Sequence, residues 1–417
     1  MKLTEVRLKY FRNLTDLVFK PHPGINFLIG PNGQGKTSLI EAISYLATLR
    51  SFRDRKAANV VQWGQKASEV SCKLTSDPSM TGAGDSWKTE LKINFDLIDL
   101  EKKKVTKSAF INHKPYKSST QYLTQKFGSV QLGFHTVVFN PSDHDLVRGE
   151  PAIRRSYLDQ VIAAQDGEYL KTLQKFQRSL HQRNTLLKNR GGIHPSVELL
   201  SGFTEPFCAF GSVLAAARID WVNRINPLLE QILSKIAPNQ KPVKISYVSS
   251  WLSREQQENL EKLALKNREL DSVHFAGQAD LGSLELLKRS LWTKLIALEA
   301  EERKVGFSLA GPHRDDWIFW LGDQVLKGHG SQGEVRSALL ALKLAEVVLF
   351  RKVTGHRPLF LLDDLSSELD QKRRSFLLQF LTETDLQTFV TTTDDPSLLG
   401  ARFWVHSGKI EEGRHDD

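Results

Sequence analysis

The chain has 417 residues, more than one typical domain holds, and its hydrophobic share of 40% can form a sizeable core. Its 57 basic and 48 acidic residues give a net charge of +9, which suits a polyanionic partner without proving one. The two cysteines do not form a C-x-x-C pair, which argues against a disulfide framework or a zinc site. The sequence has no signal-peptide core and no apolar run near ~18 residues, which excludes a membrane partner. We therefore expect a cytoplasmic protein.

The first predicted elements surround a glycine-rich loop. Leu3–Tyr10 and the short apolar run Gly24–Ile29 are predicted strands, and Leu39–Ala47 repeats its apolar residues at helical spacing. Between the second strand and the helix lies Gly30-Pro31-Asn32-Gly33-Gln34-Gly35-Lys36-Thr37. This run fits G-x-x-x-x-G-K-[ST], the phosphate-binding loop of nucleotide hydrolases.

The chemistry of such a loop explains its residue types. Glycines let backbone N–H groups turn toward phosphate oxygens, and the N-terminus of the next helix adds positive potential. We expect Lys36 to reach the β- and γ-phosphates of ATP and the Thr37 hydroxyl to hold Mg²⁺. The nucleotide-binding residues predicted here are Gly30, Pro31, Asn32, Gly33, Gln34, Gly35, Lys36 and Thr37.

A basic cluster and a β-rich region follow the first helix. Arg50 and Arg53 lie just past its end, where they could reach nucleotide or DNA, or simply form a solvated helix end. Residues 68–115 favour strands, and Thr89–Leu97 alternates as a half-buried strand does. A loop around residues 76–88 interrupts this region.

The middle of the chain favours helices. Pro151 can begin a helix, and Leu173–Leu187 carries a narrow apolar seam typical of an antiparallel helix pair. Leu284–Leu298 marks the returning helix, and we expect loops and shorter helices between the two. The first of these helices has no acidic residue from Tyr169 to Arg190, so its cations either contact the DNA backbone or form a solvated face. The candidate DNA contacts on it are Lys171, Lys175, Arg178 and Arg183.

The C-terminal part returns to mixed structure. Val305–Leu309 is predicted to be a strand, and Ser331-Gln332-Gly333-Glu334 opens a helix in a pattern that is also a capping box. Pro358–Leu362 predicts a buried strand that ends in two carboxylates. We expect Asp363 to support Mg²⁺ and Asp364 to act as general base or to orient the attacking water; the alternative is a strand that merely ends in two acids.

These motifs together resemble an ABC-type ATPase head of the SMC/Rad50 class, and within it the bacterial RecF family of recombination-repair proteins. The narrower resemblance depends on runs through most of the chain. They include Phe11-Arg12-Asn13, Arg50-Ser51-Phe52-Arg53, Gly311-Pro312-His313-Arg314-Asp315-Asp316 and Ser367-Glu368-Leu369-Asp370. The resemblance implies an α/β fold: an ABC-type head with a mixed sheet, flanking helices and an antiparallel β lobe over residues 1–135 and 303–417. A mainly helical arm would fill residues 136–302.

The resemblance also implies a function. Ser331, Gln332 and Gly333 would bind the γ-phosphate of ATP held by a second copy, and the loop ending at Asp370 would cross that dimer interface. ATP would join two heads, and weak DNA-dependent hydrolysis, with Lys36, Asp363 and Asp364 as catalytic residues, would release them. Members of this family bind duplex DNA near junctions of single- and double-stranded DNA and, with RecO and RecR, promote RecA loading. A nucleoid-associated protein of gap repair is therefore expected.

Three departures from the ABC pattern keep alternatives open. Asp364 stands where a glutamate is usual, Glu334 stands where a glutamine is expected, and Thr392 or Thr393 must replace a missing histidine, if that role exists. A DNA clamp that binds ATP without turnover is one alternative. A transporter-type ATPase subunit is the other, although the large basic helical insertion argues against it.

Overall fold

The computed structural model describes most of the chain and divides it into two compact units. The described residues are 1–54, 56–76, 87–99, 104–127, 133–188, 195–253, 255–260, 281–365, 370–396 and 399–413. The first unit comprises Met1–Asp143, Lys235–Pro238 and Leu339–Asp417, and the second His144–Ser234 and Asn239–Ala338. Most of the loop expected around residues 76–88 lies outside the described residues.

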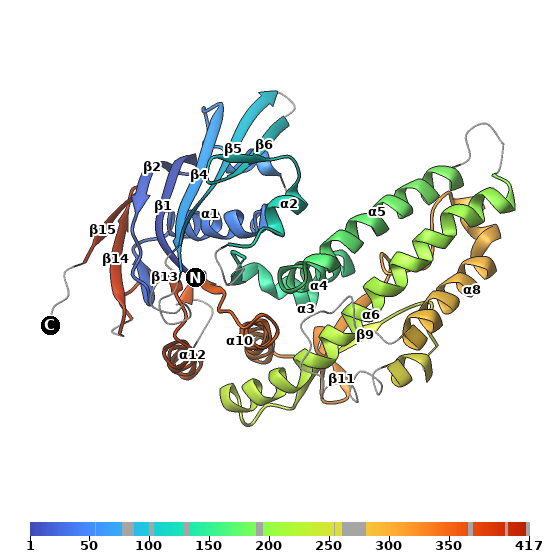
Figure 1. Cartoon of the computed structure of the whole chain (residues 1–417). Coiled ribbons are helices and arrows are strands. Elements are labelled where there is room, and N and C mark those ends of the chain that lie inside the picture. The colour runs from blue at the N-terminus through green and yellow to red at the C-terminus, as the bar shows by residue number, and fades with distance from the viewer. Residues whose placement is uncertain are drawn as a thin grey trace. The chain divides into compact units, whose positions relative to one another are not determined.

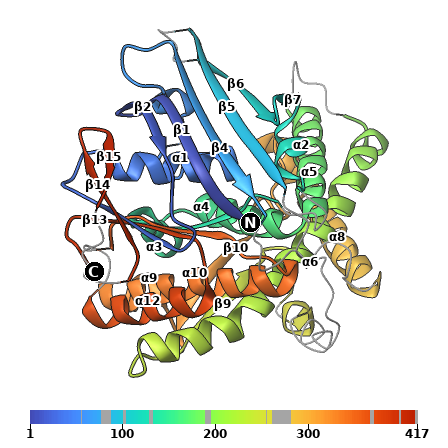
Figure 2. The same ribbon diagram turned by 60° about the vertical axis from the view of Figure 1, so that its left-hand side comes forward.

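The described part of the first unit contains two six-stranded sheets (Figures 1 and 2). The antiparallel sheet has the order β2 (Leu14–Phe19), β1 (Lys2–Phe11), β4 (Ala67–Thr75), β5 (Lys88–Asp99), β6 (Lys104–Ile111) and β7 (Lys114–Tyr116). The second sheet has the order β15 (Lys409–Glu412), β14 (Ala401–His406), β3 (Ile25–Ile29), β13 (Thr388–Thr392), β12 (Leu359–Leu362) and β8 (Thr136–Phe139). All neighbours in the second sheet pair in parallel except β14 and β15.

Helix α1 (Lys36–Thr48) packs between these sheets. Ile40 and Ile43 of α1 are fully buried in the same core as Ile93 of the antiparallel sheet and Leu361 of the parallel sheet. The helix starts where β3 ends, so its N-terminus lies at the carboxyl edge of the parallel strands, the edge at which such sheets bind ligands. Other helices described in this unit include η1 (Ala57–Val60), α2 (Ser119–Leu123), η2 (Pro141–Asp143) and α12 (Gln371–Thr384).

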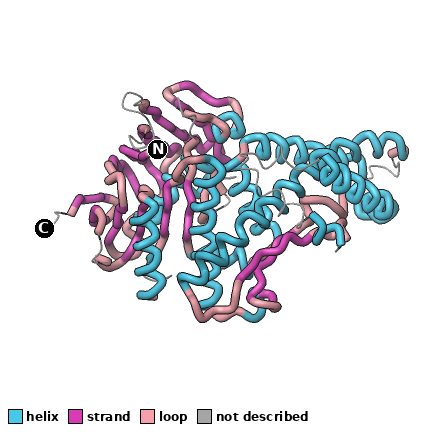
Figure 3. The backbone as a smooth tube through the Cα atoms, turned by 60° about the horizontal axis from the view of Figure 1, so that its bottom comes forward, coloured by secondary structure: helices cyan, strands magenta, loops and turns pink. Residues whose placement is uncertain are grey.

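The second unit is mainly helical, as the helix colour of Figure 3 shows. The helices described with full bounds in this unit include α3 (His144–Arg148), α4 (Pro151–Gln165), α5 (Gly167–Leu187), α6 (Val197–Ile236, whose last residues belong to the first unit), α8 (Leu281–Val305) and α9 (Leu326–His329). Helix α10 (Gln332–Thr354) begins in this unit and ends in the first. A small sheet has the order β11 (Gln324–Val325), β10 (Asp316–Leu321) and β9 (Val243–Val248).

The expected fold class is confirmed, but three details of the second unit differ from the expectations. The unit extends to Ala338, so residues 303–338, assigned to the head from the sequence, belong with the helices. Val305–Leu309 forms no strand: Gly306 has a φ of 79° and follows the end of α8, and the N–H groups of Ser308 and Leu309 donate to the side chains of Asn184 and Glu302. Backbone donors that side chains satisfy cannot also pair in a strand ladder.

The third difference concerns the pairing of helices. The segment expected to hold loops and shorter helices is largely one 40-residue helix, α6, which tolerates Pro206 and Pro227 in its interior. The ring centroids of Phe176 on α5 and Phe207 on α6 are 5.0 Å apart. Arg183, which comes later on α5, bonds Thr204, which comes earlier on α6. The antiparallel partner of α5 is therefore α6, not α8.

Among the described helices, α6 alone is long and apolar enough to cross a membrane by length and composition. Its apolar side chains are used within the unit, since Phe207, Leu214 and Trp221 are fully buried. The buried guanidinium of Arg218, on the same helix, pairs with Asp159 at 2.7 Å. These contacts are those of a core helix.

Candidate nucleotide-binding site

At two positions of the glycine loop that joins β3 to α1, the backbone takes a path that only glycine permits. Gly30 has a φ of 155°, and a Cβ there would lie 2.4 Å from the carbonyl oxygen of Val405. Gly35 has a φ of 112°, and a Cβ there would lie 2.6 Å from Leu14. Both contacts are too close for a side chain, so the residue types follow from the path of the chain.

Lys36 is the first residue of α1 and is buried. Its ammonium donates to the carbonyl oxygens of Gly30 and Pro31, the second at 2.8 Å. Burial lowers its pKa, an effect opposed by the nearby carboxylates of Asp364 and Asp363. The lysine is thus held over the loop by two carbonyl groups that a phosphate oxygen could replace.

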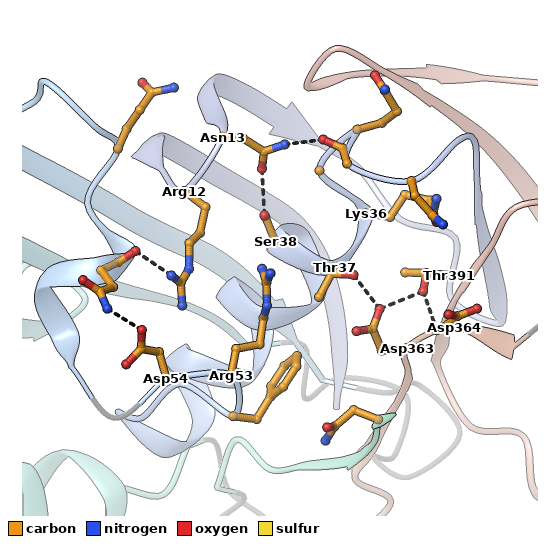
Figure 4. Close-up of a pocket in the computed structure, with 18 of the residues that line it drawn as sticks. Arg12, Asn13, Lys36, Thr37, Ser38, Arg53, Asp54, Asp363, Asp364 and Thr391 are labelled. Carbon is orange, nitrogen blue, oxygen red and sulfur yellow. Dashed lines mark hydrogen bonds between the residues drawn. The ribbon is translucent and has the colours of Figure 1, made fainter. Parts of the chain in front are cut away.

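The carboxyl end of β12 brings a second acidic segment to the loop. The carboxylate of Asp363 accepts hydrogen bonds from the hydroxyls of Thr37 at 2.8 Å and Thr391 at 2.9 Å (Figure 4). Burial raises the pKa of Asp363, and the two hydroxyl bonds oppose that shift. Hydroxyl and carboxylate oxygens are ligands that Mg²⁺ prefers, so Thr37 and Asp363 fit the ion that the loop motif implies.

Asp364 adopts a backbone conformation that is rare outside glycine. Its φ is 64°, and its N–H donates to the Thr391 hydroxyl at 2.8 Å. Such strained residues concentrate at functional sites. The sequence suggested Thr392 or Thr393 for the role of the missing histidine, and both line the same cavity, where their hydroxyls bond Asp394. Of these three threonines, Thr391 is the one that contacts Asp363.

Two segments brace the glycine loop from outside. The Asn13 side chain donates to the carbonyl of Gly33 at 2.8 Å and accepts from the hydroxyl of Ser38 at 2.8 Å. The Gln34 side chain accepts from the backbone of Ser407 at 2.7 Å. The run Phe11-Arg12-Asn13 signalled the family in the sequence, but its role as a support for the loop requires the fold.

Arginines line the site around one buried carboxylate. Glu41 on α1 has no exposed surface and accepts two hydrogen bonds from Arg12, at 2.6 and 3.0 Å. Arg53, a candidate DNA contact, approaches the same carboxylate at 3.4 Å with 44% of its side chain exposed. Arg50, the other candidate in this cluster, is exposed. Sequence reasoning missed Glu41 and Arg12 as site residues.

One cavity of about 1120 Å³ joins these groups. It is lined by residues from the glycine loop and α1, from Phe52–Asp54, from Ala58, Asn59 and Val61–Gln65, and from the ends of β8, β12 and β13. Its volume suits a ligand of nucleotide size or larger. The cavity therefore has a phosphate-binding loop, a pair of carboxylates and several cations on one continuous surface.

The expected signature motif belongs to the second unit and forms a capping box. The N–H and hydroxyl of Ser331 both donate to the Glu334 carboxylate at 2.8 Å, and the Glu334 N–H donates back to the hydroxyl at 3.2 Å. These bonds lower the pKa of Glu334. Ser331 and Gln332 are exposed at the start of α10, and Gly333 is half-buried.

Asp370, expected at the end of an interface loop, caps α12. Its carboxylate accepts from the N–H of Arg373 at 2.9 Å, and 56% of its side chain is exposed. Residues 366–369, the rest of that predicted loop, lie outside the described residues.

Three of the four candidate DNA contacts on α5 lie on its exposed face: Lys171, Lys175 and Arg178. Lys171 also pairs with Glu168 at 2.6 Å. The expectation for Arg183 is wrong, because this residue is 1% exposed. Its guanidinium bonds Glu302 at 2.6 Å, Ser308 at 2.7 Å and Thr204 at 3.0 Å. A cation saturated inside the protein cannot reach a phosphate group in solution.

The Gly311–Asp316 run is likewise a structural element of the second unit. Asp316 pairs with Arg154 at 2.7 Å, and the buried Asp315 accepts from the hydroxyl of Tyr247 at 2.6 Å. Burial raises the pKa of Asp315 to about 6, an effect that the Tyr247 bond opposes. The run therefore ties β10 to its surroundings, with only Arg314 of its polar side chains exposed.

Comparison with known proteins places these features in context. The family model for the RecF/RecN/SMC N terminal domain matches residues 2–412. The chain is 34% identical to the DNA replication and repair protein RecF of Geobacter sulfurreducens, over 95% of this chain and 94% of that one. It is 33% identical to the protein of the same name from Desulforudis audaxviator, over 99% of both chains.

Solved structures agree with the sequence comparison. The structure of the recombination mediator protein RecF with ATP superimposes with a TM-score of 0.79 at 26% identity, over 99% of this chain and 98% of that one. An SMC head bound to the winged-helix domain of ScpA superimposes with a TM-score of 0.53 at 12% identity, which supports the fold alone. The resemblance seen in the sequence motifs is confirmed.

Proposed function

The chain belongs to the RecF/RecN/SMC family, and within it to the RecF proteins; from this premise we propose that it is an ATP-dependent DNA-binding switch of recombinational gap repair. The single observation that carries the proposal is the bond between Thr37 and Asp363. It joins the helix of a phosphate loop to an acidic strand end 326 residues away, at 2.8 Å, inside a cavity of nucleotide size. That pairing is the core of a nucleotide hydrolase site.

Each residue of the site then has a role. Backbone N–H groups of Asn32–Gly35 face the phosphates, and Lys36 exchanges its carbonyl contacts for phosphate oxygens. Thr37 and Asp363 would hold Mg²⁺, which when bound neutralises charge on the phosphate groups. Asp364 orients the attacking water or accepts its proton, and its strained backbone directs the carboxylate into the cavity that it lines. Because Asp364 is one methylene shorter than the usual glutamate, we expect slow hydrolysis.

The signature segment gives this switch its second state. We infer that Ser331, Gln332 and Gly333 of one copy close over the γ-phosphate held by another copy, with Asp370 near the same interface. The exposure of Ser331 and Gln332 at a helix N-terminus supports this, since such ends favour anions. The Glu334 carboxylate holds both donors of Ser331, so it must move before they can bind phosphate. ATP would thus drive dimerisation, and hydrolysis would reverse it.

The partners follow from the family and from exposed charge. Duplex DNA, near junctions of single- and double-stranded DNA, would be bound through phosphate contacts of Lys171, Lys175 and Arg178, with Arg50 and Arg53 as further contacts. The related RecF protein solved with ATP is described as a recombination mediator in the RecFOR pathway. We therefore propose RecR, with RecO, as partner, RecA loading as the indirect outcome, and the nucleoid as the site of action.

The experiment that tests the switch measures the oligomeric state by sedimentation velocity, with and without MgATP. The wild type should dimerise only with ATP, and Lys36→Ala and Ser331→Arg should both stay monomeric. Ser234→Arg adds the same charge at another exposed serine of the second unit and should behave as the wild type. If Lys36→Ala and Ser331→Arg both dimerise and hold DNA in ATP as the wild type does, the proposal is wrong.

A clamp that binds ATP without turnover is the second candidate, favoured by the short side chain of Asp364. Phosphate release with and without duplex DNA separates the two functions. Release that rises on addition of DNA supports the switch, and an absence of release under both conditions supports the clamp.

A further inference from the structure

Trp63 is the most exposed large hydrophobic residue in the described part of the chain, with 92% of its surface open to solvent. It lies between η1 and β4 in a tight turn, closed by the N–H of Gln65 donating to the carbonyl of Gln62 at 3.0 Å. Gly64 takes a φ of 83° that the turn requires. The turn therefore presents the indole outward instead of folding it into the core.

The turn is also held firmly on both sides. Val61 forms a β-bridge with Phe11. The N–H of Gln62 donates to the carbonyl of Tyr10 at 2.8 Å, and the N–H of Leu97 donates to the carbonyl of Lys66 at 2.8 Å. An exposed side chain on an anchored turn is pre-organised, so little conformational entropy is lost when a ligand covers it.

Trp63 lines the same cavity as the phosphate loop. Among the residues of that cavity, Asn32–Ser38, Asp363 and Asp364 supply the groups suited to phosphates and Mg²⁺, whereas Val61–Gln65 and Leu97 form a segment without charged side chains. A nucleotide whose phosphates lie in the loop must place its base elsewhere in this cavity. The exposed, uncharged aromatic surface matches a flat heterocycle.

We propose that Trp63 stacks on the purine base of the nucleotide whose phosphates the glycine loop holds, and so determines how tightly a nucleoside triphosphate binds relative to the bare phosphate chain. The inference rests on the proposed function, because it takes the phosphate end of the site as given. Because 92% of Trp63 is open to solvent, a base can cover one face of the indole. Removal of such a stacking aromatic residue weakens binding of a base by about 5- to 100-fold.

The test compares two probes by titration calorimetry: MgATP and magnesium tripolyphosphate, which has phosphates but no base. Trp63→Ala should weaken MgATP binding about 5- to 100-fold and leave tripolyphosphate binding unchanged, and Trp63→Phe should retain the ATP affinity within about threefold. Trp404→Ala removes another exposed tryptophan of the same unit, 39% exposed and outside the cavity, and should bind as the wild type.

Two results would overturn the inference. The first is a Trp63→Ala variant that binds MgATP as the wild type does; weakened binding of duplex DNA by that variant would assign the indole to DNA. The second is a variant that loses both probes equally. Lys36→Ala tests the phosphate end separately: it should weaken both probes, and if it weakens neither, the nucleotide site itself is wrong.

Discussion

Charged side chains have different surroundings in the nucleotide cavity of the first unit and in the polar core of the second, the buried cluster around Arg183 and Glu302. In the cavity, Asp363 and Asp364 follow a strand end and face open space that phosphates could fill. In the second unit, Arg183 and Glu302 also carry charges, of opposite sign, but both side chains are buried and bond each other at 2.6 Å. The difference shows that a charged motif binds a ligand only where the fold leaves its polar atoms open to a cavity.

The largest effect is expected in the cavity. Asp364→Asn keeps the shape of the side chain but removes its charge, so ATP hydrolysis should fall by about 100- to 10,000-fold while ATP binding is retained. Phosphate release and ATP titration measure the two quantities. Asp16→Asn, at an exposed position on β2, is the matched control. A variant that hydrolyses ATP at the wild-type rate would remove Asp364 from the chemistry.

A nearly equal effect, on stability instead of activity, is expected in the polar core. Glu302→Ala leaves the Arg183 guanidinium buried without its partner, which should lower the free energy of unfolding by about 3–5 kcal/mol. Glu301→Ala changes the neighbouring exposed residue and should have little effect. Chemical denaturation measures both. A stable Glu302→Ala protein would mean that Arg183 can turn outward, which would reopen its role in DNA binding.

The third effect is a pH dependence of stability that arises at Asp315 in the second unit. Burial raises the pKa of Asp315 to about 6 from its ordinary value of 3.8. A raised acid pKa contributes stability below the unfolded pKa, and this contribution is lost as the pH rises through the folded value. The loss between pH 3.8 and 6 should be at most about 3 kcal/mol. Asp315→Asn should flatten the unfolding free energy in this window, and an unchanged slope would contradict the assignment.

The smallest effect concerns the exposed face of α5. Replacing Lys171, Lys175 and Arg178 together by alanine should lower the slope of log affinity for duplex DNA against log salt by about 2–3 units. The matched control replaces Lys9, Lys20 and Lys409, exposed cations of the first unit. If the control lowers the slope and the α5 variant does not, DNA lies on the first unit instead.

The amino-acid sequence alone was enough to establish the local chemistry: the glycine loop, the strand that ends in Asp363 and Asp364, the capping box at Ser331 and the family. These signals depend on neighbours within a few residues, which a single sequence displays. Three-dimensional packing was needed to show that Thr391 bonds Asp363 and that Glu41 pairs with Arg12 and Arg53. It was also needed to show that α6 packs against α5 and that Arg183 is buried. Those outcomes depend on which side chains, distant in sequence, pack together and exclude water. That packing, and not the residue type, sets the free-energy cost of burying a charge.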